Sequence, residues 1–109
     1  MSYFYDLKEI GRKELAPGVT VKLVWGDKIM ISMIEMAPFA IVPVHSHSNE
    51  QAGMVLQGEF DFTIAGGGPD DSYVIPDGVE HGLVGLDGWA LALDIFSPPR
   101  EEYKGEGRS

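Results

Sequence analysis

The chain has 109 residues, with 14 glycines, 7 prolines, no cysteine and a formal net charge of −9. This length predicts one domain spanning residues 1–109, and the absence of thiols excludes a disulfide framework and a thiolate metal site. Eight basic residues scattered along an acidic chain argue against binding to nucleic acid or to an anionic membrane surface.

The first ten residues, MSYFYDLKEI, contain no basic flank followed by a long apolar run. We therefore expect no signal peptide and no membrane span, and the lack of cysteine fits a cytoplasmic location. Residues 6–14 predict one or two turns of helix, because Gly11 weakens the helical tendency of this segment.

The segments that follow predict short β-strands separated by turns rich in glycine and proline. Residues 19–25 alternate and are rich in β-branched side chains, and residues 28–36 form a second apolar run. In residues 59–64 the apolar side chains face one way and the polar ones the other, which is the period of two of a half-buried strand. Further strands are expected at 54–57, 73–75 and 89–96, with a loop at 66–71 and a disordered tail at 104–109. Many short strands at close spacing predict an all-β sandwich or barrel.

The three histidines of the chain are His45, His47 and His81. Residues i and i+2 of a strand point to the same face, so a strand through the HSH segment aims two imidazoles at one point, as a divalent metal requires. Gln51 follows after a short turn and offers an oxygen from the neighbouring strand. His81 follows a turn at residues 76–78 that can start another strand. The alternative is that HSH is a surface turn and His81 an ordinary core histidine.

Two sequence motifs around these histidines resemble those of the cupin family. The first spans residues 43–59, PVHSHSNEQAGMVLQGE, with HxH, an amide four positions later and a glycine after six more residues. The second lies within residues 70–84 and contains PDGVEH, which fits PxGxxH. Two positions depart from the family pattern: Asp70 replaces the usual glycine, and Gln51 replaces the usual glutamate.

This resemblance implies a cupin domain over the whole chain, with an all-β double-stranded β-helix, or jelly-roll, barrel. The barrel would hold one divalent transition metal, for which nickel, zinc, iron, manganese and copper all stay open. The implied ligands are His45, His47, Gln51 and His81, although a one-residue bulge would let Glu50 replace Gln51. Three neutral imidazoles and one amide leave the charge of the metal near +2, which favours an anionic ligand.

The last predicted strand, WALALDIF at residues 89–96, has two faces of different character. One face carries small residues, a carboxylate and an aromatic ring: Ala90, Ala92, Asp94 and Phe96. This composition is typical of a cavity wall, where Asp94 can act as a general acid or base; otherwise Asp94 lies at the barrel rim and binds backbone groups. The opposite face is aliphatic and predicts a second packing layer, either the other sheet or the second subunit of a homodimer.

The strand leads into a double proline that stiffens the chain before Arg100. Arg100 can then lie over the barrel mouth and bind a carboxylate through two hydrogen bonds, or it is a solvated surface side chain. The stretch DIFSPPREEY resembles that of small single-domain cupins associated with pectin degradation, whose implied reaction opens the ring of 4,5-unsaturated uronates. By this resemblance Asp94 and Arg100 are catalytic, and Phe96 and Arg100 bind the substrate.

Other functions stay open at this point. Cupins with such a site include dioxygenases, lyases and isomerases of other small acids, and oxygen uptake would identify a dioxygenase. A non-catalytic module would bind a sugar acid without turning it over, and a barrel without metal is a further possibility. The expected partner in the first two cases is a small anionic molecule.

Overall fold

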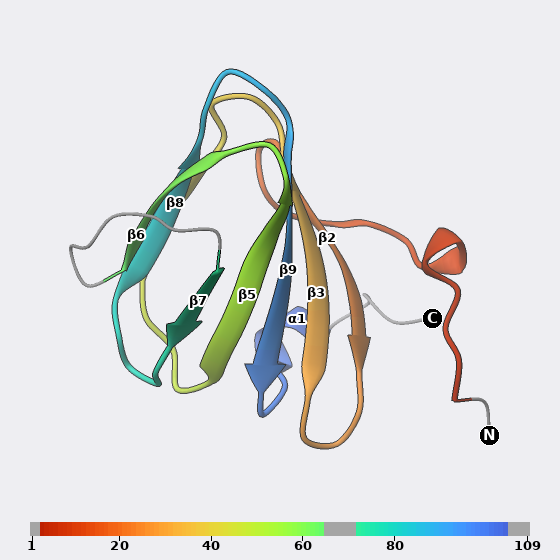
Figure 1. Cartoon of the computed structure of the whole chain (residues 1–109). Coiled ribbons are helices and arrows are strands. Elements are labelled where there is room, and N and C mark those ends of the chain that lie inside the picture. The colour runs from red at the N-terminus through yellow and green to blue at the C-terminus, as the bar shows by residue number, and fades with distance from the viewer. Residues whose placement is uncertain (1–2, 65–71, 105–109) are drawn as a thin grey trace.

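The computed structural model describes residues 3–64 and 72–104, which form two antiparallel sheets facing each other (Figure 1). The strands are β1 (Lys13–Ala16), β2 (Val19–Trp25), β3 (Met30–Met36), β4 (Ile41–His45), β5 (Glu50–Gln57), β6 (Phe60–Ile64), β7 (Ser72–Ile75), β8 (His81–Gly85) and β9 (Ala90–Ser97). One sheet has the order β1-β2-β3-β9-β5-β7 and the other the order β4-β8-β6. The all-β jelly-roll barrel predicted from the sequence is confirmed.

The core lies between the two sheets, where alternate residues of each strand are buried. Val19, Val21 and Leu23 of β2 are at most 1% exposed, whereas the residues between them are half-buried. Met30 and Met36 of β3 are fully buried as well. Each such side chain contributes about 1.5–3 kcal/mol on burial, so the period of two in the sequence decides which face of each strand turns inward.

The expected strands are present with ends shifted by a few residues, and the N-terminal segment forms the shorter of the two helices that its prediction of one or two turns allowed. Only one turn forms in residues 6–14, a 3-10 helix at Leu7–Glu9. Residues 13–16 pair with β2 as strand β1 instead, because pairing satisfies backbone groups that a short isolated helix leaves open. One short helix, α1 (Glu101–Lys104), was not expected.

Some sequence expectations concern positions that the structure does not describe. The loop at 66–71, the position of Asp70 and the tail after Lys104 lie outside the described residues. Within residues 3–64 and 72–104, no helix is long and apolar enough to cross a membrane.

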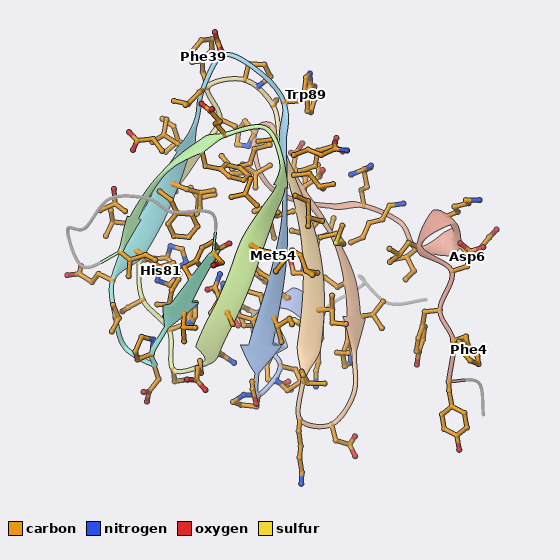
Figure 2. The ribbon with its side chains drawn as sticks, viewed as in Figure 1. Phe4, Asp6, Phe39, Met54, His81 and Trp89 are labelled. Atoms are coloured by element: carbon orange, nitrogen blue, oxygen red, sulfur yellow. The ribbon has the colours of Figure 1, made fainter. Side chains whose placement is uncertain are left out.

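The outer face of the six-stranded sheet carries the aliphatic residues of the last strand. Leu91, Leu93 and Ile95 are half-buried and alternate with fully buried residues of β9. Of the two layers predicted to cover them, the other sheet is excluded, because the three-stranded sheet covers the opposite face. Met54 pairs with Leu93 on this outer face and is 46% exposed (Figure 2). The homodimer expected to cover this face stays a prediction.

Candidate functional site

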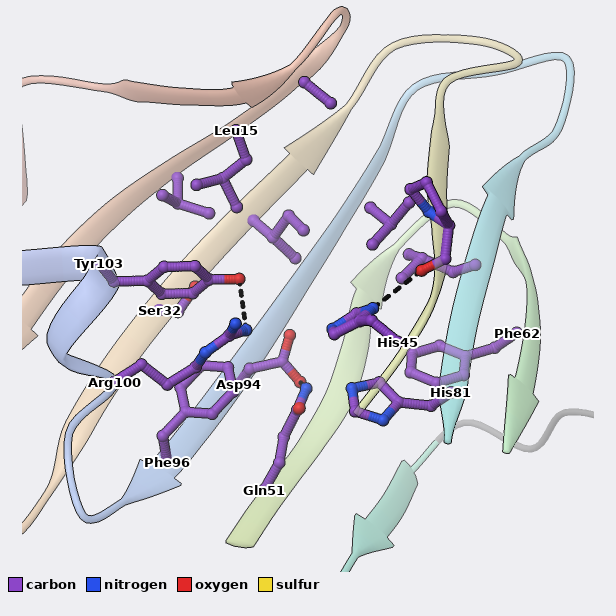
Figure 3. A pocket seen from close by; sticks show the side chains of 16 residues that line it. Leu15, Ser32, His45, Gln51, Phe62, His81, Asp94, Phe96, Arg100 and Tyr103 are labelled. Carbon is purple, nitrogen blue, oxygen red and sulfur yellow. Dashed lines mark hydrogen bonds between the residues drawn. The ribbon is translucent and has the colours of Figure 1, made fainter. Parts of the chain in front are cut away.

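The candidate site residues come from strand ends that meet at one end of the barrel (Figure 3). His45 is the last residue of β4 and His81 the first of β8, and the two are direct partners in this antiparallel pair. On the other sheet, Gln51 near the start of β5 pairs with Phe96 near the end of β9. The two sheets therefore bring polar side chains together from four separate segments of the chain.

His47 lies beyond β4, in the loop that leads to β5. The prediction that both histidines of the HSH segment share one strand face is therefore wrong for His47, because β4 ends at His45. Two hydrogen bonds fix the loop instead. The backbone N–H of Gly78 donates to the carbonyl of His47 at 2.8 Å, and the amide of Asn49 donates to the carbonyl of Pro98 at 2.6 Å. Gly78 has a φ of +79°, which glycine adopts without strain, so the PxG turn of the second motif holds the first motif in place.

The imidazoles of His45, His47 and His81 lie together, with one candidate ligand nitrogen from each ring within 4.8 Å of the others. In every ring, Nδ1 lies 2.8–3.0 Å from a backbone carbonyl two residues away: Pro43 for His45, Asn49 for His47 and Val79 for His81. A carbonyl only accepts hydrogen bonds, so each Nδ1 carries the hydrogen and each neutral ring keeps a lone pair on Nε2. Histidines that ligate metals are oriented in this way.

The donor atoms of this group fit a divalent cation. Oε1 of Gln51 lies 3.1 Å from Nε2 of His47, and both atoms are acceptors when Nδ1 holds the ring hydrogen. A cation at this point satisfies both, and imidazole nitrogens with an amide oxygen form a ligand set that transition metals accept. Glu50, the alternative ligand, is exposed, whereas Gln51 is buried. Gln51 is therefore the better placed oxygen.

The surroundings of His47 and His81 favour the neutral form of these two rings. Burial is the main cause that lowers the pKa of His47 and of His81 below the usual 6.5. The positive charge of Arg100 lowers the pKa of His47 further. Because a metal binds the neutral imidazole, these shifts favour the form of His47 and His81 that can bind a metal.

Asp94 is 6% exposed and lies beside the amide of Gln51. Its Oδ1 accepts a hydrogen bond from Nε2 of Gln51 at 3.1 Å and another from the hydroxyl of Tyr73 at 2.6 Å. Burial raises the pKa of Asp94 above its usual 3.8, and the two hydrogen bonds partly oppose that rise. The carboxylate is thus held by side chains inside the barrel instead of by backbone groups at the rim. A raised pKa suits a group that exchanges protons near neutral pH.

Arg100 follows β9 and turns back over the cavity, with a side chain that is 10% exposed (Figure 3). Its Nη1 donates to the hydroxyl of Tyr103 at 2.7 Å, and its Nε lies 3.3 Å from a carboxylate oxygen of Glu102. The guanidinium carbon lies 4.1 Å from the ring centroid of Tyr103 and 5.5 Å from that of Phe96. These contacts hold a positive charge at the cavity, so Arg100 is not a solvated surface side chain.

A cavity of about 260 Å³ lies between the sheets at this end of the barrel. Its polar lining comes from seven side chains: Ser32, His45, Gln51, His81, Asp94, Arg100 and Tyr103. The remaining lining is apolar: Leu15, Ala16, Val21, Ile34, Val42, Pro43, Phe62, Leu83 and Phe96. This volume lies just below the roughly 300 Å³ at which pockets for drug-sized molecules start. The cavity is therefore suited to one small molecule with a polar and an apolar side.

Sequence reasoning did not single out Tyr73, Tyr103 or Gly53. Tyr73 reaches Asp94 from β7, and Tyr103 supports Arg100 from α1. A glycine inside a strand often marks a close approach of neighbouring groups, and Gly53 pairs with both Tyr73 and Asp94. Gly53 was therefore the sequence feature that could have indicated the close approach of Tyr73 to Asp94. Nothing comparable marked Tyr103.

Comparison with known proteins identifies the class to which this barrel and site belong. The Cupin domain family matches residues 32–95, and the chain therefore belongs to the cupin family. The pectin degradation protein KdgF of Dickeya dadantii (strain 3937) is 31% identical over 107 residues, which cover 93% of this chain and 96% of that protein. The solved structure of KdgF from Halomonas sp. matches with a TM-score of 0.85 at 28% identity, covering 94% of this chain and 99% of that one.

A further relative is the H2HPP isomerase of Bacillus subtilis. It is 28% identical over 102 residues, which cover 88% of this chain and 43% of that protein. The resemblance to small cupins of pectin degradation, first drawn from the two motifs and the DIFSPPREEY stretch, is confirmed by these matches.

Proposed function

We propose that this chain is an enzyme that opens the ring of 4,5-unsaturated uronate monosaccharides, with a divalent transition metal held by His45, His47, Gln51 and His81. One observation carries the proposal: Asp94 and Arg100 line the same cavity as members of the histidine group, in a chain similar to a pectin degradation protein over 93% of its length. A metal bound there supplies a Lewis acid for a substrate oxygen.

The proposed reaction is an isomerisation, so its atoms balance without a co-reactant. In the substrate, the ring oxygen joins C1, as part of a hemiacetal, to C5, as part of an enol ether conjugated with the carboxylate. Opening breaks the bond between C1 and the ring oxygen, and the C1 hydroxyl loses its proton as the aldehyde forms. The ring oxygen leaves as an enolate, which becomes a ketone when C4 gains a proton.

Asp94 is the group proposed to move these protons. The hydrogen bonds from Gln51 and Tyr73 both use Oδ1, and Oδ2 has no hydrogen-bond partner in the part of the chain that the structure describes. Oδ2 can therefore take a proton from one position of the substrate and return one to another. Its raised pKa, caused by burial, brings the acid and base forms closer together in energy near neutral pH.

Arg100 is proposed to bind the substrate carboxylate, and Phe96 to provide an apolar wall for the sugar ring. The described contacts of the guanidinium use Nε and Nη1. Nη2 has no hydrogen-bond partner among residues 3–64 and 72–104 and can donate to a carboxylate. In a buried site such a charge-assisted hydrogen bond is strong and fixes the orientation of the sugar relative to Asp94.

The test is to add a 4,5-unsaturated uronate to purified protein of known metal content and to follow the ultraviolet absorbance of the conjugated enol ether. We expect the absorbance to fall faster than in buffer, and Asp94→Asn to lower turnover by about 10²-fold or more. The asparagine keeps an oxygen that can accept from Gln51 and Tyr73, so metal content should not change. Decay at the buffer rate with wild-type protein would reject ring opening, and full turnover by Asp94→Asn would remove Asp94 from the mechanism.

A second candidate is isomerisation of another small acid, which the similarity to the H2HPP isomerase favours. It would use the same cavity, with Arg100 on a carboxylate and Asp94 moving a proton. Turnover of a different unsaturated acid, with uronates left unchanged, would support this candidate. Oxygen consumption would instead indicate a dioxygenase, and tight binding of a sugar acid without turnover would indicate a binding module.

A further inference from the structure

Three residues form one row across the neighbouring strands β7, β5 and β9. Gly53 of β5 pairs with Tyr73 on one side and with Asp94 on the other. Side chains of directly paired residues project from the same face of a sheet, and here that face is the inner one. Because Gly53 has no side chain, the phenol of Tyr73 reaches across it, and the hydroxyl donates to Oδ1 of Asp94 at 2.6 Å.

The space for this hydrogen bond depends on Gly53. A Cβ at this position would overlap Oδ1 of Asp94 and would lie 2.6 Å from the hydroxyl oxygen of Tyr73, closer than real Cβ contacts occur. The ring of Tyr73 is also held from the opposite sheet, because its centroid lies 4.4 Å from that of Phe62 on β6. Both sheets thus fix the hydroxyl in place.

The same carboxylate oxygen decides how the amide of Gln51 is oriented. Oδ1 of Asp94 accepts from Nε2 of Gln51 at 3.1 Å. An amide that donates from its nitrogen here must turn its oxygen the other way, and Oε1 lies 3.1 Å from Nε2 of His47. With the amide turned over, the histidine group would face N–H donors, which cannot ligate a metal.

We propose that Tyr73 is a positioning residue that fixes Asp94 across Gly53 and thereby directs the amide oxygen of Gln51 towards the histidine group. Tyr73 is not among the described residues that line the cavity, so it acts through Asp94. Burial raises the pKa of Tyr73, and the nearby Asp94 raises it further, so the phenol stays a hydrogen-bond donor. The ligand role of Gln51 rests on the proposed function, whereas the orientation of its amide does not.

The amide orientation can be measured in metal-free protein, because the chain has two glutamines, Gln51 and Gln57. Heavy-nitrogen labelling of glutamine side chains gives two pairs of N–H signals, with the exposed Gln57 as the internal reference. Tyr73→Phe keeps the ring and removes only the hydroxyl, and we expect it to shift the Gln51 signals and leave Gln57 unchanged. The control is Val74→Ala, on the exposed face of β7, which should shift neither. Unshifted Gln51 signals in Tyr73→Phe would overturn the proposal.

The second measurement is the affinity for Zn²⁺, determined by competition with a chelator. We expect Tyr73→Phe to weaken Zn²⁺ binding about tenfold, the effect typical of groups that orient a metal ligand. In the Gln51→Ala background there is no amide to orient, so adding Tyr73→Phe should cause no further loss. Equal losses in both backgrounds would overturn the proposal, since Tyr73 would then act on the barrel as a whole.

These outcomes separate the inference from the proposed function. If Tyr73→Phe shifts the Gln51 signals and weakens Zn²⁺ binding while the wild type leaves uronates unchanged, the reaction is wrong and the positioning role stands. If the wild type opens uronates while Tyr73→Phe changes neither measurement, the positioning role is wrong and the reaction stands.

Discussion

The two walls of the cavity hold their polar side chains in different ways. On the three-stranded sheet, His45 and His81 are each oriented by a carbonyl two residues away on their own segment. On the six-stranded sheet, Asp94 is held by Gln51 and Tyr73, which are 43 and 21 residues away in the chain. The histidine wall is thus built locally, and the carboxylate wall depends on the register of three strands.

This difference implies a division of roles. Rings oriented by their own segment keep their orientation when distant residues change, so we expect the histidine wall to decide whether a metal binds. Asp94 is held by side chains from β5 and β7, so a substitution in either strand can displace its carboxylate. We therefore expect the carboxylate wall to decide how a bound substrate reacts. Substitution of a histidine should remove metal, and substitution of Tyr73 should weaken metal binding through Gln51. Substitution of Asp94 or Arg100 should lower turnover or substrate affinity with the metal retained.

The largest effect is expected when a histidine is removed. His81→Asn leaves two imidazoles, and we expect Zn²⁺ affinity to fall at least about 100-fold, because ligand loss exceeds the cost of removing an outer partner. Chelator competition measures this, with circular dichroism to check the fold. Asp94→Asn on the opposite wall is the control and should keep its metal. Wild-type affinity in His81→Asn would show that the histidines are not the metal centre.

Acid should weaken metal binding at the histidine wall, at a pH that depends on how far burial lowers the histidine pKa values. The pKa values of His47 and His81 lie below 6.5, so their rings stay neutral in more acidic solution than a free imidazole. Once protons occupy Nε2, Zn²⁺ affinity should fall about tenfold per pH unit for each ring involved. In calorimetric titrations at a series of pH values, the loss of affinity that is due to His47 and His81 should therefore begin at a lower pH than it would for two unshifted imidazoles.

The free energy of unfolding of the metal-free protein should depend on pH through the same two histidines. The unfolded chain takes up protons at the usual histidine pKa of 6.5, whereas the folded chain does so only at lower pH. Between pH 6.5 and the lower pKa values of the folded state, the unfolded state therefore binds more protons than the folded state. The free energy of unfolding should fall as the pH drops through this window. Below the folded pKa values, these two rings should cause no further fall. Urea unfolding on both sides of pH 6.5 measures the change. Asp94, whose pKa is raised by burial, acts in the opposite direction, so the comparison is made in the Asp94→Asn variant. Stability that rises on acidification across this window in that variant would contradict lowered histidine pKa values.

The histidine wall is also the part of the site that sequence reasoning could reach. The carbonyls that orient the rings lie within or next to the HxH and PxGxxH motifs. The local sequence therefore predicts how these rings are placed. His47 is the exception, because its loop is held by Gly78 and Asn49 through contacts that depend on the second motif and on the exit from β9. A strand pattern alone therefore assigned it to the wrong element.

The carboxylate wall was predicted in part. Alternation along β9 placed Asp94 and Phe96 on one inward face, and the period of two is enough to establish that. The partnership of Asp94 with Tyr73 could not be predicted, because it requires knowing that β7 and β9 flank β5 in one register. Register across strands distant in the chain is fixed by tertiary pairing and is not encoded in either strand alone.

The smallest effect is expected at the edge of the carboxylate wall, for Arg100→Lys. Lysine keeps the positive charge but loses the planar group that donates to Tyr103 and lies over the rings of Phe96 and Tyr103. If Arg100 binds the substrate carboxylate in the ground state and in the transition state alike, KM for the uronate should rise about tenfold with kcat little changed.

The control is Arg12→Lys, an exposed arginine paired with Glu35, which should alter neither constant. An unchanged KM in Arg100→Lys, with metal content retained, would show that this guanidinium supports α1 through Tyr103 and that the substrate carboxylate binds elsewhere in the cavity.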